Sequence, residues 1–525
     1  MLIAERLTET ARLFPDREAV VCEAERLSWR ELDERAARMA GGLRGLGVQA
    51  GDFVVLQLPN GIAYLVAFYG ALRIGATVVP ANPRYPLPEL LHILQDCQAA
   101  AIVLPASGAQ QLQTIRGNVP TLRHVLAVDG PAVAGNSIPL DAWLATQTPF
   151  VPSAPPVLAA TPATCLYTAG TTGRPKGALL SHAGLLWDFD QARQRFAINE
   201  HDRCLCVLPL FHSYAQMACL LASVSSGAAL VILPQFRPEA AIRAVATERI
   251  SVFPAVPAHF GALLSAIRPD TPVDFRSLRV AVTGGAAMPP PVLHALQERY
   301  GISVLEGNGP TEAGPLAYLN PEQGVRKPGS VGLPVPGVQV RIADAQDAEL
   351  PRGTPGEVLV RGPNVMVGYL NQPEQTRTAL RNGWLHTGDL GLQDEDGYVF
   401  LIDRLVDLIL VGGLNVYPQE VERALLLHPA VADAAVVGAP DTTRGDRVVA
   451  FVVFRPGAAA AEQDVIRYCR TQLAPYKCPR TVLVREELPR NAAGKINKAE
   501  LRVLAQEHQL SGDPRADGAD GLERA

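Results

Sequence analysis

Short β-branched runs alternate with helical patterns along most of this chain, and that alternation limits the folds open to it. Residues 52–58 and 163–168 read as strands, whereas residues 30–48 and 62–76 carry apolar side chains at helical spacing. Strands separated by helices form largely parallel sheets whose faces the helices cover. The sequence therefore predicts a multidomain α/β fold of layered sheets and helices.

The pattern changes twice towards the C-terminus. Residues 330–400 carry short apolar runs between Gly, Pro and Asp clusters, typical of an antiparallel or barrel-like β region. A compact unit of roughly 100 residues follows, enough for a small domain. We predict an N-terminal domain over 1–403, made of two α/β subdomains and a β-barrel-like subdomain. A small C-terminal α+β domain is expected over 404–510 and a disordered tail over 511–525.

Composition excludes several function classes. The formal net charge of -5 and the pI near 6.1 leave no basic stripe for nucleic acid. The eight cysteines form no C-x-x-C pair, which argues against a metal site and fits a reducing compartment. Residues 204–235 lack charge, but Pro and Gly interrupt them, so a helix and a buried strand are expected rather than an integral membrane span. We expect a cytoplasmic protein.

The most informative segment is residues 167–177, Tyr-Thr-Ala-Gly-Thr-Thr-Gly-Arg-Pro-Lys-Gly, directly after a strand-like run. Its glycines let backbone N–H groups approach an anion closely, and its threonine hydroxyls add donors. Lys176 supplies a positive charge for a polyphosphate. A Walker A motif is excluded, because Gly177 rather than Ser or Thr follows the lysine.

This string resembles the signature loop of the acyl-adenylate-forming superfamily, which includes acyl-CoA synthetases, 4-coumarate–CoA ligases, luciferases and nonribosomal adenylation domains. The family usually has serine where Ala169 stands, so one hydroxyl is missing here. The resemblance implies ATP, Mg²⁺ and coenzyme A, with Thr172 near the metal. It assigns the following phosphate contacts: Thr168, Ala169, Gly170, Thr171, Thr172 and Lys176.

Further strings in the family's order extend the resemblance over nearly the whole chain. Residues 208–212 resemble the segment whose histidine, here His212, lies beside the acyl pocket. Gly307-Asn308-Gly309-Pro310-Thr311-Glu312 resembles the G-Y-G-x-T-E string, whose threonine contacts the α-phosphate and whose glutamate holds Mg²⁺. Asn308 replaces the aromatic residue that stacks on adenine. The glycine turn along the adenine corresponds to Gly284, Gly285 and Ala286.

The C-terminal strings complete this series. Asp389 and Arg404 match the residues that reach the ribose, and Lys495 matches the lysine that bridges substrate carboxylate and phosphate. Val406 stands at the usual Lys or Asp hinge of the mobile C-terminal domain. The residues that resemble the family's coenzyme A side are Gly412, Gly413 and Lys477.

The resemblance implies that a carboxylic acid and ATP give acyl-AMP and pyrophosphate, and that coenzyme A then takes the acyl group. A ligase that loads a carrier protein, or a nucleotide-binding relic weakened by the departures at Ala169, Asn308 and Val406, are the alternatives. The acid pocket is expected among His212, Ser213 and residues 254–259, 284–288 and 313–316. Medium or longer fatty acids and aryl acids both remain open.

Overall fold

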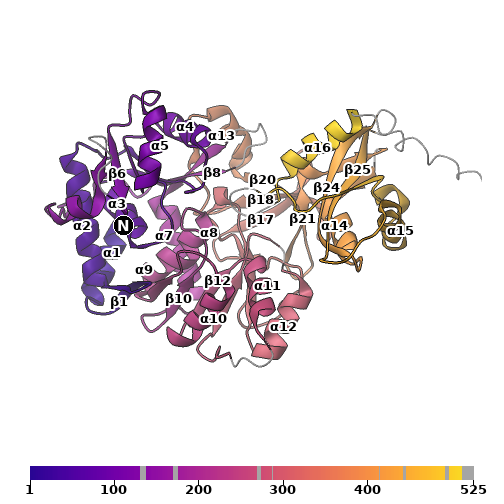
Figure 1. Ribbon diagram of the computed structural model, residues 1–525, viewed down its shortest axis with the longest axis horizontal. Coiled ribbons are helices and arrows are strands. Elements are labelled where there is room, and N and C mark those ends of the chain that lie inside the picture. Colours follow the sequence, from indigo (N-terminus) through magenta and orange to yellow (C-terminus); the bar gives the residue numbers. More distant parts are fainter. Residues whose placement is uncertain are drawn as a thin grey trace, which may run out of the picture.

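The computed structural model describes residues 1–130, 137–168, 175–268, 273–286, 288–412, 414–441, 445–490 and 496–510. Two large sheets with helices on their faces form the N-terminal part, as the alternating pattern predicts (Figure 1). Within the described ranges no helix is both long and apolar enough to cross a bilayer.

The first large sheet has nine strands, with a parallel centre and antiparallel edges. Its centre contains the strand that was expected to hold Cys204 and Cys206, two buried thiols. In spatial order the strands are β16 (Leu333–Pro334), β15 (Tyr318–Leu319), β14 (Val304–Asn308), β13 (Val280–Thr283), β12 (Val252–Ala255), β10 (Arg203–Cys206), β11 (Ala229–Ile232), β1 (Glu18–Cys22) and β2 (Glu25–Ser28).

The second large sheet has eight strands and a parallel centre, and the β8–β9 hairpin is antiparallel. That hairpin carries Thr168 and Lys176 at paired positions. The order is β19 (Gly368–Tyr369), β9 (Lys176–Ser181), β8 (Pro162–Thr168), β4 (Thr77–Pro80), β3 (Phe53–Leu56), β5 (Ala101–Pro105), β6 (His124–Val128) and β7 (Ile138–Pro139).

The largest hydrophobic core joins residues of both sheets to the helices packed against them, and it buries Trp29, Phe68 and Phe189 completely or nearly so. The helices of this part are α1 (Ile3–Leu13), α2 (Trp29–Gly45), α3 (Ile62–Arg73), α4 (Leu87–Asp96), α5 (Ala106–Arg116), α6 (Leu140–Ala145), α7 (His182–Arg195), α8 (Ser213–Ala215), the π-helix Gln216–Leu221, α9 (Ala222–Ser226), α10 (Pro238–Thr247), α11 (Pro257–Ala266), α12 (Pro290–Tyr300) and the 3-10 turn Thr311–Ala313. The uncharged stretch 204–235 contains buried helices and strand β11, as expected.

The region expected to be antiparallel or barrel-like is an open four-stranded antiparallel sheet among the described residues, so the barrel part of the expectation was wrong. Its edge strands β17 and β21 do not pair with each other, and α13 (Pro373–Ala379) lies beside it. The strands in order are β17 (Gln339–Ala343), β18 (Gly356–Arg361), β20 (Leu385–Gln393) and β21 (Val399–Arg404).

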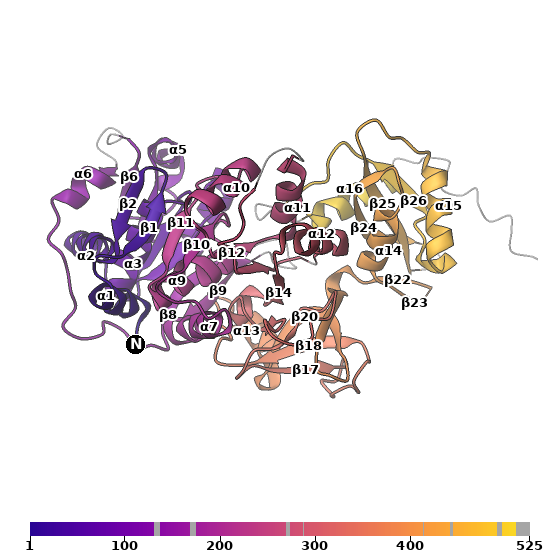
Figure 2. The same cartoon turned by 90° about the horizontal axis from the view of Figure 1, so that it is seen from below.

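The C-terminal part has a sheet and cores of its own, and it forms a lobe beside the rest of the molecule (Figure 1 and Figure 2). The long antiparallel pair of β24 and β25 forms the centre of this lobe, and helices pack on both of its faces. Its elements are β22 (Ile409–Val411), β23 (Leu414–Val416), α14 (Pro418–Leu426), β24 (Val431–Asp441), β25 (Gly445–Phe454), α15 (Glu462–Gln472), β26 (Thr481–Val484) and α16 (Lys498–Leu510).

A buried carboxyl group lies beneath the 3-10 turn that follows β14. Asp188 on α7 is completely buried, and burial raises its pKa well above the usual value. Gly314 packs directly on it in the left-handed region (φ +54), and a Cβ there would lie 1.8 Å from Asp188 Oδ2. The turn can approach α7 this closely because residue 314 has no side chain, and burial favours the protonated form of the Asp188 carboxyl group.

We expect Asp188→Asn to stabilise the protein, and increasingly so as pH rises. An acid whose folded pKa is raised loses stability as pH rises from its unfolded to its folded pKa, by at most about 1.4 kcal/mol per pH unit, because folding must bind a proton. Asparagine has the same shape and no such requirement. Urea unfolding at several pH values from about 4 to 8 measures the difference.

Asp190→Asn is the matched control on the same helix, because Asp190 is partly exposed and pairs with Arg6 at 3.3 Å. This control should give at most a small loss of stability without the same growth with pH. A pH-independent difference between Asp188→Asn and the parent protein would contradict a neutral Asp188.

Candidate active site

A cavity of about 1010 Å³ lies where the carboxyl ends of strands from both large sheets face β20, β21 and the C-terminal lobe. Ligand sites of open parallel sheets form at this edge. The cavity brings together most of the residues that the sequence strings single out. Lining residues among them are Thr168, His212, Gly284, Gly285, Ala286, Gly307, Asn308, Gly309, Thr311, Glu312, Asp389 and Arg404.

The structure does not place the remaining predicted residues on the cavity wall, for two different reasons. Ala169, Gly170, Thr171, Thr172, Gly413 and Lys495 lie outside the described residues. Their described neighbours Thr168, Pro175, Arg490 and Asn497 do line the cavity. Gly412 belongs to the β22–β23 hairpin, and Lys477 forms an ion pair with Glu420 at 2.6 Å, so the structure does not bring these two to the cavity.

Glu312 is held by two hydroxyl groups from the second large sheet. Thr168 Oγ1 donates to Glu312 Oε1 at 3.0 Å, and Tyr369 Oη donates to the same oxygen at 3.1 Å. Burial, helped by Glu312, raises the pKa of Tyr369, so its phenol keeps its proton. Lys176 Nζ lies 5.2 Å from the centroid of the Tyr369 ring and is not on the cavity wall. Since both hydroxyls use Oε1, Oε2 is the oxygen left for a cation.

That arrangement suits a magnesium ion shared with a polyphosphate. Among the described residues no group of three or more His, Cys, Asp and Glu side chains could hold a metal by itself. Mg²⁺ usually keeps several waters and binds through one or two carboxylates together with substrate phosphates. The cavity supplies Glu312 for this purpose, so the residues present fit Mg²⁺ bound with a nucleotide.

Asp389 and Arg404 stand opposite each other on the paired strands β20 and β21, with Arg404 Nη1 3.0 Å from Asp389 Oδ1. Two hydrogen bonds to backbone N–H groups hold the turn that contains Asp389. Thr387 Oγ1 accepts from the Asp389 N–H at 3.0 Å, and Glu357 Oε1 accepts from the Gly388 N–H at 3.2 Å. A carboxylate held in this way, beside a guanidinium, suits a vicinal diol such as a ribose.

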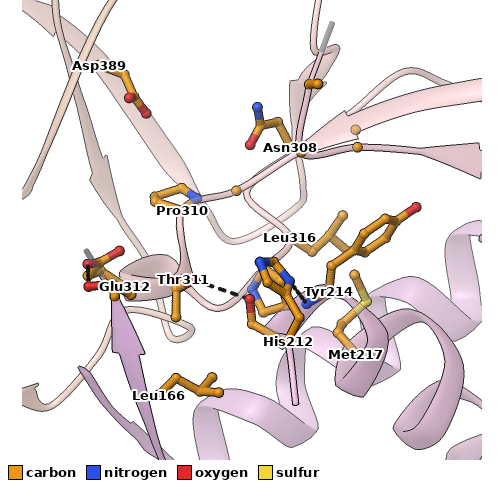
Figure 3. A pocket seen from close by; sticks show the side chains of 18 of the residues that line it. Leu166, His212, Tyr214, Met217, Asn308, Pro310, Thr311, Glu312, Leu316 and Asp389 are labelled. Carbon is orange, nitrogen blue, oxygen red and sulfur yellow. Dashed lines mark hydrogen bonds between the residues drawn. The ribbon is translucent and has the colours of Figure 1, made fainter. Parts of the chain in front are cut away.

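His212 and Thr311 lie lower in the view of Figure 3 than Asn308 and Asp389, and all four residues line the cavity. His212 Nδ1 accepts from the Tyr214 N–H at 3.2 Å, so the neutral ring carries its proton on Nε2. Ser213 Oγ lies 3.2 Å from Thr311 Oγ1. The cavity wall therefore carries three side chains here that can donate hydrogen bonds, namely His212, Ser213 and Thr311.

Apolar side chains form part of the cavity wall, which is called the apolar arm here and is defined by Leu166, Phe196, Tyr214, Met217, Ala218, Val282, Leu316 and Leu319. Tyr214 Oη donates to the carbonyl of Val282 at 3.0 Å, which satisfies the phenol inside the protein. Phe196 follows the last residue of α7, and its carbonyl accepts from Arg279 next to the start of β13. The arm therefore includes Val282 near the carboxyl end of β13 and Phe196 close to its amino end.

Residues 313–316 contribute to the cavity wall, as expected, through Pro315 and Leu316. Residues 254–259 do not line it. Sequence reasoning missed most of the arm, although part of the uncharged stretch 204–235 forms it. It also missed Glu306, a half-buried carboxyl on the wall, whose pKa burial raises and whose Oε1 accepts from the Met288 N–H at 3.4 Å.

Comparisons with known proteins agree with this geometry. A model of the AMP-binding enzyme family matches residues 7–370, and one of the AMP-binding enzyme C-terminal domain matches residues 420–495. The chain is 39% identical to a 3-[(3aS,4S,7aS)-7a-methyl-1,5-dioxo-octahydro-1H-inden-4-yl]propanoyl:CoA ligase of Mycobacterium tuberculosis, over 95% of this chain and 98% of the relative. It is 33% identical to a long-chain-fatty-acid–CoA ligase of Bacillus subtilis, over 94% and 93% of the two chains.

The crystal structure of ATP-bound MatB from Rhodopseudomonas palustris superposes with a TM-score of 0.88 at 31% identity, and covers 97% of this chain and all of that one. This similarity extends over both the sheets and the C-terminal lobe.

We expect Tyr369→Phe to weaken the binding of magnesium with ATP. The substitution removes one donor to Glu312 Oε1 and keeps the ring beside Lys176. A hydrogen bond to a charged group contributes about 1.5–3 kcal/mol, so a tenfold or larger loss of Mg²⁺ affinity is expected. Calorimetric titration of the protein with ATP at several Mg²⁺ concentrations measures this directly.

Tyr468→Phe is the matched control, because the Tyr468 phenol donates to the Leu427 carbonyl in the C-terminal lobe at 3.0 Å. Its Mg²⁺ dependence should equal that of the parent protein. If Tyr369→Phe also behaves like the parent, the phenol does not orient Glu312.

Proposed function

Because this chain belongs to the AMP-binding enzyme family, we propose that it is an AMP-forming carboxylic acid–CoA ligase. Its reaction joins a carboxylic acid to AMP with release of pyrophosphate, and then transfers the acyl group to coenzyme A. The observation that carries this proposal is the cavity itself, in which Thr168 of β8, Asp389 of β20 and Arg404 of β21 meet Thr311 and Glu312 of the 3-10 turn after β14.

The arrangement supports in-line attack of a carboxylate on the α-phosphorus of ATP. Asp389 and Arg404 hold the ribose, and Thr311 lies where the α-phosphate meets the acyl arm. Thr168, Lys176 and residues 169–172 are assigned to the phosphates, and Lys495 is assigned to the bridge between carboxylate and phosphate. When bound at Glu312 and Thr172, magnesium neutralises phosphate charge. No enzyme nucleophile is required, because positioning and charge neutralisation lower the barrier.

The apolar arm favours an acid with a flexible alkyl chain. Its lining side chains are aliphatic or aromatic, and the only phenol among them, Tyr214, already has a partner in the protein. A free polar group on the acid would lose its hydrogen bonds to water there. The named relatives are ligases for a long-chain fatty acid and for a bicyclic propanoic acid with two ketone groups. Both acids are larger than acetate, and the fatty acid is the one that suits an arm without free polar partners.

Coenzyme A is the acceptor that the sequence favours. Residues 474–479 resemble the Y-K-x-P string of acyl-CoA synthetases, and Lys477 and the hairpin around Gly412 are assigned to the acceptor side. These residues lie away from the cavity in this structure, so the C-terminal domain, proposed as 404–510, must turn relative to residues 1–403 before the second step. A cytoplasmic location remains a prediction from the sequence.

A single assay matrix tests the function. We expect purified protein with ATP, Mg²⁺ and fatty acids of increasing length to release pyrophosphate, and to form thioester when coenzyme A is added. Mass spectrometry of the thioester and a coupled pyrophosphate assay measure both steps. Acid-dependent pyrophosphate without thioester would favour a carrier-protein ligase. No product with any acid would favour the nucleotide-binding relic suggested by Ala169, Asn308 and Val406.

We expect Ala218→Trp to shift the enzyme from long acids to short ones. Ala218 is buried on the wall of the apolar arm, so an indole there fills the arm without touching the nucleotide side. Adenylation of hexadecanoate should fall at least tenfold relative to butanoate, and retained activity on butanoate shows that the variant folds.

Met217→Ala widens the same arm and should keep its activity on hexadecanoate. If Ala218→Trp loses activity on long and short acids in equal proportion, the acyl chain does not enter this arm.

A further inference from the structure

The carboxylate of Asp403 lies at the boundary between the two parts of the chain. It belongs to β21, the last strand before the C-terminal lobe, is almost fully buried, and lines the cavity. Its Oδ1 accepts from the Arg404 N–H at 2.8 Å, and its Oδ2 accepts from the N–H of Gln419 at 3.0 Å. The second bond crosses to α14, the first helix of the C-terminal lobe.

This bond takes the place of a helix cap. The first N–H groups of a helix have no partner inside the helix and need an acceptor. The residue before α14 is Tyr417, which supplies no side-chain cap, and Pro418 has no N–H. Gln419 is therefore the first donor of α14, and a carboxylate from the other part of the chain satisfies it. A negative charge is also favourable at this end of a helix.

A second interaction ties Asp403 to the segment at the cavity. Lys498 opens α16 and forms an ion pair with Glu422 of α14 at 2.9 Å, with both side chains mostly buried. Lys498 is also close enough to act electrostatically on Asp403, where it opposes the rise in pKa that burial causes. Of the other charges nearby, Asp407 acts in the same sense as burial, and it is itself paired with Arg502.

The residue before Lys498 is Asn497, which lines the cavity together with Arg490. Ile496 pairs with Arg490 in an antiparallel bridge. Arg490 and Asn497 therefore lie on the cavity side of the lobe, and the same lobe carries Lys498 and α14.

We propose that Asp403 is a positioning residue, whose carboxylate caps α14 and so holds the C-terminal lobe in the orientation that places Arg490 and Asn497 at the cavity. The inference rests on the proposed function, since it assigns this orientation to the adenylation step. Turning the lobe about residues 404–406 separates Asp403 from Gln419, so the cap is a contact of one orientation. Loss of this hydrogen bond therefore destabilises the adenylation orientation of the lobe and leaves its other orientations unaffected.

Gln419→Pro tests the cap at its donor. Proline at this position deletes the N–H that Asp403 accepts, and it is tolerated in the first turn of a helix. The chain already begins α12 with Pro290 and Pro291, so consecutive prolines fit a helix start in this protein. Gln419→Ala is the matched control, because it shortens the same side chain and keeps the N–H.

The two half-reactions are measured separately on the full chain. Acid-dependent exchange of labelled pyrophosphate into ATP reports adenylation, and thioester formation from supplied acyl-AMP and coenzyme A reports the transfer. We expect Gln419→Pro to lower the first roughly tenfold or more relative to the second, while Gln419→Ala keeps the parent ratio. If Gln419→Pro changes both half-reactions by the same factor, so that the ratio of their rates equals that of the parent protein, the proposal is overturned.

Small-angle X-ray scattering of the three proteins gives a readout that does not depend on activity. Gln419→Pro should scatter as a broader set of lobe orientations than the parent, and Gln419→Ala should match the parent. If the parent itself forms neither product, the proposed function fails, and the scattering still decides whether Asp403 holds the lobe. Identical scattering from all three proteins would count against the cap.

Discussion

The hydrogen bond from Thr168 to Glu312 joins the two large sheets at the point where the chemistry is proposed. Thr168 ends β8 of the second sheet, and Glu312 follows β14 of the first. Tyr369, on the edge strand of the second sheet, donates to the same carboxylate oxygen. The geometry of the cavity therefore depends on how the two sheets pack on their shared core, because neither sheet alone contains both partners.

Buried polar side chains also fix the turn that carries Thr311 and Glu312. Gly314 can pack on α7 only without a side chain, and burial raises the pKa of the carboxyl group below it and so favours its neutral form. Asn364 donates to the carbonyl of Leu316 at 3.2 Å and so fixes the far side of the same turn. Each contact constrains the backbone that carries Thr311 and Glu312. Rigidity of this kind lets a site stabilise charge without reorganising.

The sequence predicted the layered α/β architecture, because alternating strands and helices leave few other arrangements. It also predicted the lobe at the C-terminus and most of the residues that meet at the cavity. Strand patterns alone could not distinguish an open sheet from a barrel, since closure depends on whether edge strands pair. Tyr369 was missed for a related reason. It lies 57 residues from Glu312, and their contact depends on the pairing of β19 with β9, which no local periodicity encodes.

Cavity shape also constrains how two reactions can share one site. On the proposed function, an acid in the apolar arm and a nucleotide at Asp389 and Arg404 leave the acyl carbon one open side. That side faces the C-terminal lobe, which here presents Arg490 and Asn497. A thiol has to approach the same carbon from the same side. On the proposed function, the lobe must therefore leave before the thiol enters, and the residues at its boundary, Asp403 first among them, determine the free-energy cost of leaving.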